Sequence, residues 1–525
     1  MLVSRQAVDE FLDRRLESYL WMKGLTREDI ERELKQLKVQ PVFKTRPWLH
    51  QLVSFYIGIC QPYFLFLLDM GLGKSKILAD LITQAVREKS VQRALITVPR
   101  VINMSSWARD LAVHSELEPW LIDVADSEEK WERLSQPKGE VTVIDYQGLH
   151  WAVCDKVKIK GKKAKTALVR NDKKMAHLRK LYQFIGIDES HYLKSHDNLW
   201  FGIMQQLVKD ARHVHATTGT LFNKDPTDMW SQFYLVDGGE TFGANLGMFR
   251  GAFFTAEADD WAGTKFVYNK RRSVDLNRML QHRSIRYDQD EVPEVDLPKR
   301  THIMEELDFD PEQREHYLRA LQGLINAQGQ GEDKLKAPWI RMRMILSGYL
   351  AWNDDEGSHL IHFKRNPKME EMERLLEEMG DSKIVVVHYY VETGRLITEH
   401  LNKLKIKHTW LYGGTKNKAA TVETFMGDPT CRVFVMNSAS GGVGNDGLQK
   451  VAQYMYMFET PTGPTEREQC VKRIHRPGQR ERVFIYDPVI RRSIDKGILE
   501  DIAAGRDLYT SVLNGQRLRR DILRG

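Results

Sequence analysis

Residues 60–80 of the chain read CQPYFLFLLDMGLGKSKILAD. An apolar run ends at Leu68, the turn Gly71-Leu72-Gly73 follows, and a helical pattern begins near Lys74. A strand, a glycine turn and a helix start are typical of a phosphate-binding loop, because backbone N–H groups and the positive end of the helix face an anion. We expect Lys74 to reach the β- and γ-phosphates of a nucleoside triphosphate and Ser75 to hold Mg²⁺. Leu68 stands where the usual pattern has a glycine, and an ordinary tight turn is the alternative interpretation.

Length and composition limit the class of protein. The chain has 525 residues, which is too long for one ordinary core and predicts two large domains with extensions. It is 42% hydrophobic and 29% charged, as in soluble globular proteins, and the net charge of +6 permits nucleic-acid binding without demonstrating it. No apolar stretch is long enough to span a membrane, and the first residues lack a signal-peptide core. The four scattered cysteines form no C-x-x-C pair, which argues against a zinc site or disulfide framework and favours the cytoplasm.

Short apolar runs alternate with helical patterns in two blocks of the chain. The first block, residues 43–237, has the runs FLFLL, ALITV, LIDVA, VTVID, FIGID and HVHATTG. The second, residues 381–505, has KIVVVHY, KHTWLYG, CRVFVMN, AQYMYMF and RVFIYDP. This alternation predicts an α/β fold with two parallel sheets covered by helices.

The segments around these blocks complete the expected organisation. Residues 1–42 are expected to form a helical N-terminal extension, residues 238–380 a mostly helical linker, and residues 506–525 a basic tail. Residues 155–180 are strongly basic and interrupt the first block as a surface insertion. The insertion is either a solvated loop or a contact for a nucleic-acid backbone, and charge alone does not choose between them.

Two adjacent carboxylates follow the apolar run FIGI. Buried carboxylates are costly unless they meet a cation, and beside a phosphate loop that cation would be Mg²⁺. Asp188 would hold the ion, Glu189 would orient or deprotonate the attacking water, and His191 would sense the γ-phosphate. The alternative interpretation is an acidic helix N-cap. After the next apolar run, Thr217-Thr218-Gly219-Thr220 could link the nucleotide site to a neighbouring surface, although turns often contain such residues.

The second block carries a glycine-rich loop, Ser438–Gln449, and a stretch with helical spacing, EREQCVKRIHRPGQR. Arg473 and Arg476 are three residues apart, so we expect them to share one helix face. Such a pair could stabilise charge on the transferred phosphoryl group as an arginine finger. A solvent-facing basic helix is the alternative.

Taken in order, these motifs resemble the Swi/Snf-like branch of the superfamily-two helicase-related ATPases over about residues 43–505. RPWLHQ (Arg46–Gln51) resembles the adenine-reading segment, and DMGLGKS resembles the phosphate loop of the family, which also lacks the first glycine. The next motifs of the first lobe are resembled by four stretches: LITVPRVINMSSWARDL, VIDYQGL, DESHYLKS and TGTLFNKDPTDMWSQFYLV. A later helix of the family with the pattern Q-x-x-x-Y is resembled by DPEQREHYLRAL. QCVKRIHRPGQ (Gln469–Gln479) is very close to the final motif.

The resemblance implies a role for individual residues. The ATP-binding residues would be Arg46, Gln51, Met70, Gly71, Leu72, Gly73, Lys74, Ser75, Lys76, Gly442, Gly444 and Gln469, with Ser75 and Asp188 as metal ligands. The catalytic residues would be Lys74, Asp188, Glu189, Arg473 and Arg476. Coupling or DNA-facing residues would be Arg100, Trp107, Tyr146, His191, Lys194, Thr218, Gly219, Thr220 and Asp446. Two departures affect coupling: the glycine loop is longer than in the family, with Asp446 in place of an asparagine, and TPTGPTE replaces the motif W-N-P.

The implied protein has two RecA-like lobes with the nucleotide in the cleft between them, uses ATP and Mg²⁺, and moves along duplex DNA by sequence-independent, salt-sensitive backbone contacts. A protein partner would supply targeting, and the compact chain suggests a viral or prokaryotic source. Two other functions fit the same scaffold: a strand-separating helicase or fork-remodelling and annealing enzyme, and an ATP-dependent DNA-binding switch or clamp that does not translocate. RNA or an RNA polymerase could replace free DNA, and the sequence leaves the oligomeric state open.

Overall fold

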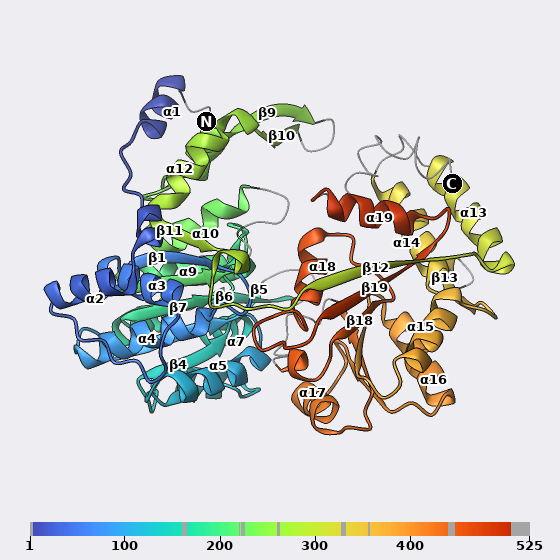
Figure 1. The fold of residues 1–525 in the computed structure, drawn as a ribbon. Helices are drawn as coiled ribbons and strands as arrows, with labels where there is room; N and C mark the ends of the chain where they lie inside the picture. Colours follow the sequence, from blue (N-terminus) through green and yellow to red (C-terminus); the bar gives the residue numbers. More distant parts are fainter. Residues whose placement is uncertain are drawn as a thin grey trace. The chain divides into compact units, whose positions relative to one another are not determined.

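A computed structural model describes residues 4–159, 165–219, 221, 226–259, 263–326, 332–354, 357–438 and 447–505. The chain divides into two compact units, Met1–Val295 and Asp296–Gly525. Each unit is built on its own parallel sheet (Figure 1).

The sheet of the first unit contains seven described strands in the order β11-β1-β8-β7-β2-β4-β3, and every neighbouring pair is parallel. β1 (Tyr63–Leu68) lies between β8 and β11, so the strand that leads into the phosphate loop is paired on both sides. The other strands of this sheet are β2 (Ala94–Val98), β3 (Pro119–Leu121), β4 (Val141–Asp145), β7 (Phe184–Asp188), β8 (His213–Thr218) and β11 (Ser284–Tyr287).

Both faces of this sheet are covered, which explains why its strands are continuous apolar runs. Successive side chains of a strand point to opposite faces. Phe64 and Phe66 therefore pack with helices α3 (Leu49–Cys60) and α4 (Lys74–Arg87), whereas Leu65 joins the core on the other face.

The first unit contains further described helices. They are α1 (Arg5–Leu12), η1 (Leu20–Gly24), α2 (Arg27–Gln36), α5 (Val101–His114), α6 (Ser127–Ser135), α7 (Tyr146–Val153), α8 (Asp172–Leu181), η2 (Ser190–Leu193), α9 (Leu199–Leu207), η3 (Val208–Asp210), α10 (Asp228–Asp237), α11 (Leu246–Phe253), η4 (Lys270–Arg272), α12 (Ser273–Arg283) and η5 (Gln289–Glu291). Two antiparallel hairpins extend from the unit: β5 (Cys154–Ile159) with β6 (Lys165–Arg170), and β9 (Phe254–Asp259) with β10 (Gly263–Tyr268).

The second unit repeats the layered plan with six described strands in the order β12-β19-β18-β15-β17-β16, again parallel throughout. The strands are β12 (Arg300–Leu307), β15 (Ile384–His388), β16 (His408–Leu411), β17 (Val433–Asn437), β18 (Tyr454–Met457) and β19 (Val483–Ile490). The described helices are α13 (Pro311–Asn326), α14 (Glu332–Leu346), α15 (Pro367–Glu378), α16 (Val391–Lys403), α17 (Lys418–Gly427), η7 (Leu448–Lys450), α18 (Pro464–Val471) and α19 (Ile494–Ala503). A further hairpin pairs β13 (Tyr349–Asp354) with β14 (Gly357–His362).

The predicted fold class, two parallel α/β lobes with a small helical N-terminal extension, is confirmed. One expected strand is misplaced: LIDVA overlaps β3 only at Leu121, because the chain turns toward Asp126, whose carboxylate caps α6. Where residues 238–380 are described, they form helices and also six strands: β11 belongs to the first sheet, β12 to the second, and the other four form two hairpins. The compact units divide inside this segment, and the predicted domain boundaries stay a prediction.

Where the basic insertion, residues 155–180, is described, it consists of the hairpin β5–β6 and helix α8. Its most basic stretch, residues 160–164, lies outside the described residues, and so does the tail, residues 506–525.

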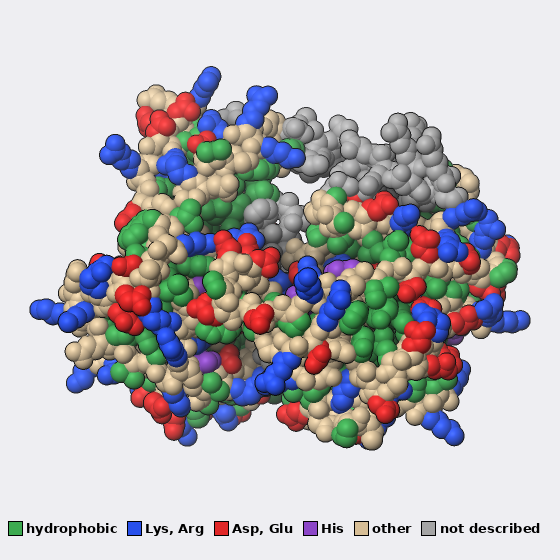
Figure 2. Space-filling view, viewed as in Figure 1, with side chains coloured by type: hydrophobic (Ala, Val, Ile, Leu, Met, Phe, Trp, Pro, Cys, Tyr) green, Lys and Arg blue, Asp and Glu red, His purple; other side chains and the backbone are tan. Residues whose placement is uncertain are grey.

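All four cysteines are free thiols. No helix among the described residues is long and apolar enough to cross a membrane. Figure 2 shows basic and acidic side chains intermixed over the visible face of each unit, in keeping with the modest net charge.

The core of the first unit contains a histidine whose titration should affect stability. His215 on β8 is fully buried, its ring stacks on Phe66, and neither ring nitrogen has a hydrogen-bond partner in the part of the chain that the structure describes. Burial lowers the pKa of His215 to about 3. The unfolded chain takes up this proton near pH 6.5 and the folded chain does not, so folding stability falls as the pH falls below that value.

We expect the variant His215→Leu to have a flatter dependence of unfolding free energy on pH than the parent chain. Between pH 6.5 and pH 4 the difference in slope should approach about 1.4 kcal/mol per pH unit, because one proton is involved. Urea unfolding at a series of pH values measures it, with the exposed His177→Gln as control. Equal slopes in all three proteins would contradict the prediction.

Candidate functional site

The phosphate loop has the geometry that its glycines predict. β1 ends at Leu68 and α4 begins at Lys74, with Gly73 as its N-cap in the left-handed region (φ 79°). Gly71 also has positive φ (87°). Backbone strain requires glycine at residue 73, and a Cβ there would lie 2.4 Å from Gln51 Nε2 and displace the Gln51 amide from the Leu72 carbonyl.

Neighbouring segments hold this loop from two sides. Gln51 Nε2 donates to the carbonyl of Leu72 at 3.1 Å, and the His50 ring lies 2.8 Å from the same oxygen. On the other side Gln289 donates to the carbonyl of Met70 at 2.6 Å. Sequence reasoning found Gln51 but missed His50 and Gln289, and Gln289 is too distant in the chain for any local signal.

Asp188 is fixed at the end of β7 by three groups. Its carboxylate accepts hydrogen bonds from Trp107 Nε1 at 2.9 Å and Thr217 Oγ1 at 3.0 Å, while Tyr146 donates its hydroxyl to the Asp188 carbonyl at 2.6 Å. Burial, with the neighbouring Glu189 carboxylate, raises the pKa of Asp188. A bound cation would offset this cost, which is the environment expected of a metal ligand.

Glu189 faces the phosphate loop. Its Oε1 lies 2.5 Å from Lys74 Nζ, and its Oε2 lies 3.2 Å from His191 Nδ1 and 3.4 Å from Thr218 Oγ1. Burial alone would raise the pKa of Glu189, but the Lys74 ammonium and His191 outweigh it, so the pKa is lowered well below its usual range. Glu189 also has positive φ (50°), an unusual backbone for a non-glycine residue. The carboxylate is therefore held ionised and in a fixed place.

The threonine-rich segment after β8 meets the same site. A Cβ at Gly219 would lie 3.5 Å from Lys74 Nζ, and Thr218 Oγ1 lies 3.0 Å from the His191 ring. The structure thus brings Lys74, Glu189, His191, Thr218 and Gly219 together, and the roles predicted for them stay predictions.

A second set of contacts leads from η2 to helix α10. Ser190 donates to Gln232 at 2.8 Å, and Gln232 in turn donates to the carbonyl of Leu221 at 2.5 Å. Lys194 forms a salt bridge of 3.2 Å with Asp228 at the start of α10. Gln232 is fully buried and was not singled out from the sequence.

Three predicted roles need correction. Trp107 and Tyr146 are each 1% exposed, so neither faces DNA, and both instead position Asp188. Lys76 is buried in a 2.9 Å salt bridge with Asp80 and donates to the carbonyl of Thr45, so its side chain has no contact to offer a nucleotide. These three side chains can be buried because neighbouring groups satisfy their polar atoms, and a linear motif does not show which of its side chains are buried.

Other predicted residues keep accessible positions. Arg46 and Arg100 are exposed, and Ser75 and Gln469 are half-buried. Their roles stay predictions. Thr220, Gly442, Gly444 and Asp446 lie outside the described residues.

The two arginines of the final motif do not share a helix face, so that prediction is wrong. Helix α18 ends at Val471, and the chain continues through irregular turns. Pro477 lies further along and disfavours helical backbone at Arg476, the residue before it. Arg473 is buried and Arg476 half-buried. Gln449 donates to the Pro477 carbonyl at 3.3 Å, which ties this turn to the end of the glycine-rich segment.

The segment that replaces W-N-P is anchored by a buried carboxylate. Glu459 accepts hydrogen bonds from the backbone N–H groups of Tyr389 (2.6 Å) and Tyr390 (2.9 Å), and from Thr393 Oγ1 at 2.7 Å. These donors lie at the N-terminus of α16, where the helix dipole also favours an anion. Arg343 donates to the next carbonyl, that of Thr460, at 2.8 Å. Sequence reasoning noted the departure but not Glu459.

The residues present suit Mg²⁺ together with a nucleotide. Among the described residues no group of three or more His, Cys, Asp or Glu side chains could hold a metal ion by itself. Mg²⁺ is usually bound through one or two protein ligands, several waters and substrate phosphates, so Ser75 and Asp188 form a sufficient protein set.

A phosphate loop after an interior parallel strand, with two carboxylates at the end of β7, which β8 separates from β1, defines a nucleotide-binding α/β protein. A model of the SNF2-related domain matches residues 47–353, more than half of the chain, and the chain belongs to this family. The Swi/Snf-like resemblance is confirmed, and membership supports an ATP-hydrolysing enzyme.

Similar proteins cover smaller parts of the chain. The DNA repair and recombination protein RDH54 of Saccharomyces cerevisiae is 31% identical over 140 residues, 26% of this chain and 15% of that protein. The RAD54-like DNA repair and recombination protein of Drosophila virilis is 28% identical over 138 residues, 26% of this chain and 17% of that protein. The matches therefore span less than a fifth of either relative. The Sulfolobus solfataricus SWI2/SNF2 ATPase core in complex with dsDNA is 17% identical with a TM-score of 0.39, over 91% of this chain and 95% of that one.

We expect Gly73→Ala to abolish nucleotide binding, because the new Cβ would collide with Gln51 and the backbone there has positive φ. Titration with a fluorescent ATP analogue measures the affinity. Gly202→Ala, in helix α9 with open space around it, is the matched control and should bind as tightly as the parent chain. Tight binding by Gly73→Ala would contradict the assigned geometry.

Proposed function

We propose that this chain is a DNA-stimulated ATPase that translocates on duplex DNA and remodels DNA or protein–DNA complexes. The observation that carries the proposal is the contact of Lys74 with Glu189, beside Asp188, in a chain of the SNF2-related family. Two relatives named for DNA repair and recombination support DNA as the partner. A cytoplasmic location and a targeting protein remain predictions.

The proposed chemistry uses the groups around the phosphate loop. ATP with Mg²⁺ supplies the phosphoryl group and neutralises its charge, and Ser75 and Asp188 would hold the ion. A phosphate that reaches Lys74 competes with Glu189 for the ammonium, so binding frees the Glu189 carboxylate. Glu189 then orients the attacking water and accepts its proton. Trp107 and Thr217 keep Asp188 in place throughout.

Coupling to DNA is proposed to follow the hydrogen bonds that leave this site. Glu189 contacts His191 and Thr218, and Ser190 contacts Gln232 on α10. A change at Glu189 therefore alters groups that hold η2 against α10. The exposed Arg100, at the start of α5, is proposed to contact the DNA backbone.

Steady-state ATPase activity with no nucleic acid, duplex DNA, single-stranded DNA, forked DNA and RNA tests the function. We expect the strongest stimulation by duplex DNA, with little dependence on sequence and a steep loss of stimulation as the salt concentration is raised.

Glu189→Gln should keep ATP affinity and lose turnover by at least about a hundredfold, because it removes the proton acceptor. Lys74→Ala should lose both.

Other outcomes would favour the other functions. Preference for forked or single-stranded DNA would indicate a strand-separating or fork-remodelling enzyme, and DNA-stimulated turnover without displacement of a triplex strand would indicate a switch or clamp. Undiminished hydrolysis by Glu189→Gln would contradict its role.

We expect Arg476→Ala to lower turnover at saturating ATP by about a hundredfold or more while changing ATP affinity little, because an arginine finger acts mainly on charge that develops in the transition state. Steady-state kinetics at saturating ATP give kcat, and a separate binding titration gives the ATP affinity. Arg480→Ala, an exposed arginine of the same turn, is the control. A large loss of affinity with normal turnover would oppose the assignment.

A further inference from the structure

A buried pair of opposite charges lies in helix α4, the helix that begins at the phosphate loop. The side chains of Lys76 and Asp80 are 5% and 2% exposed, and Lys76 Nζ lies 2.9 Å from Asp80 Oδ2. Lys76 Nζ also donates to the backbone carbonyl of Thr45 at 2.9 Å. The pair thus joins the phosphate-loop helix to the segment that precedes helix α3.

The stability of α4 does not explain this pair. Lys76 stands in the first turn, where the helix dipole favours an anion, and a lysine four residues before an acid is the weaker order for a helical ion pair. Burial raises the pKa of Asp80 to about 6 although Lys76 offsets part of the rise, and Asp80 Oδ1 has no hydrogen-bond partner among the described residues. An apolar pair of similar volume is often at least as stable in a buried position. A role in positioning accounts for what stability leaves unexplained.

The segment that Lys76 holds is attached to the phosphate loop at its other end. Trp48 donates its backbone N–H to Gln51 Oε1 at 3.0 Å, and Gln51 Nε2 donates to the carbonyl of Leu72 at 3.1 Å. Arg46 stands between the two attachments, and its side chain is exposed. The place of Arg46 beside the phosphate loop therefore depends on Gln51 on one side and on Lys76 on the other.

Further contacts keep this segment folded onto the first unit. Thr45 Oγ1 lies 2.6 Å from Nδ1 of His114 in α5. Lys44 Nζ donates to the carbonyl of Ala112, also in α5, at 2.9 Å. These contacts come from α5, whereas the contact of Lys76 comes from the phosphate-loop helix itself. Loss of Lys76 should therefore leave the segment attached to the unit and change its place relative to the loop.

We propose that Lys76 is a positioning residue for the base of the nucleotide: held by Asp80, it fixes the backbone of Thr45 and so sets where Arg46 stands beside the bound base. The proposal rests on the nucleotide site of the proposed function and adds to it a source of selectivity. Lys74 and the loop bind the phosphates, which leaves the segment before α3 to contact the other end of the nucleotide. Lys76 does not contact the nucleotide and acts through this segment.

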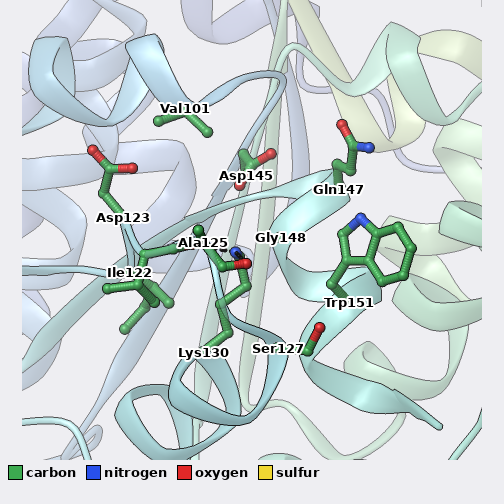
Figure 3. A pocket seen from close by; sticks show the side chains of 11 residues that line it. Val101, Ile122, Asp123, Ala125, Ser127, Lys130, Asp145, Gln147, Gly148 and Trp151 are labelled. Atoms are coloured by element: carbon green, nitrogen blue, oxygen red, sulfur yellow. Dashed lines mark hydrogen bonds between the residues drawn. The ribbon is translucent and has the colours of Figure 1, made fainter. Parts of the chain in front are cut away.

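A second buried lysine of the first unit gives a matched control. Lys130 of α6 donates to the backbone carbonyls of Val124 and Ala125, the latter at 2.9 Å. Figure 3 shows Lys130 among the residues that line a pocket of about 360 Å³ at the end of β4. Strands β8, β7 and β2 separate β4 from β1, which leads into the phosphate loop. Lys130→Met thus removes a buried lysine that binds backbone carbonyls, but does so at a different place in the sheet.

Calorimetry on the full chain with Mg²⁺ and without DNA tests the proposal, with ATP and inorganic tripolyphosphate, which has no base, as the probes. We expect the parent chain and Lys130→Met to bind ATP more tightly than tripolyphosphate. In the double variant Lys76→Met/Asp80→Leu this preference should fall by about tenfold or more, while the affinity for tripolyphosphate stays within about twofold of the parent value. The double variant leaves no unpaired buried charge, so it should fold.

The exposed Arg46 supplies a second, independent variant. Arg46→Ala should lose the same preference for ATP, and its addition to the double variant should cost little more, because both changes act on one contact with the base. An additive loss would indicate that Lys76 acts elsewhere.

Three other results would also overturn the proposal: an unchanged preference in the double variant or in Arg46→Ala, an equal loss of affinity for ATP and tripolyphosphate, and a parent chain without preference for ATP. Because these measurements use neither DNA nor turnover, a lack of DNA stimulation would contradict the proposed function and leave this test intact.

Discussion

Two adjacent carboxylates at the end of one buried strand are the constraint on which the first unit depends. Asp188 and Glu189 repel each other and lose hydration, so the fold must supply compensation from several segments. Lys74 comes from the phosphate loop, Trp107 from α5 and Thr217 from β8. These elements are distant in the sequence, and a parallel sheet brings the carboxyl ends of their strands to one edge. The groups that compensate the charges of Asp188 and Glu189 therefore stand at the same edge of the sheet where the proposed nucleotide chemistry needs them.

The second unit solves a similar problem around different residues. Arg467 of α18 forms two hydrogen bonds of 2.7 Å with Asp487 of β19, and both are buried. Glu459 draws the end of β18 onto the start of α16. These contacts hold the segment TPTGPTE, which stands where the family has W-N-P, by means of buried charged side chains. The second unit is therefore well packed although it lacks W-N-P.

Much of the fold could be read from the sequence. Strands such as Phe184–Asp188 and Ile384–His388 are buried on both faces, which leaves continuous apolar runs that a linear pattern reveals. The turn after Cys470 was missed because R-x-x-R has helical spacing, although helix α18 ends at Val471, before both arginines. The burial of Trp107 was missed because Asp188, which accepts its hydrogen bond, lies 81 residues further along the chain. The burial of Lys76 was missed although its partner Asp80 lies only one turn further along the same helix, because a linear motif does not show which face of a helix is buried.

By itself the sequence determined the phosphate loop, the acidic pair, the two α/β lobes and the family, because these depend on local backbone geometry and on short-range hydrophobic pattern. Only the tertiary structure decided which distant groups complete the site. Gln289 lies 219 residues beyond the carbonyl it binds, and Trp107 donates to a carboxylate that lies 81 residues further along the chain. Such long-range contacts follow from the sum of all packing energies and leave no periodic or spacing signal in the chain.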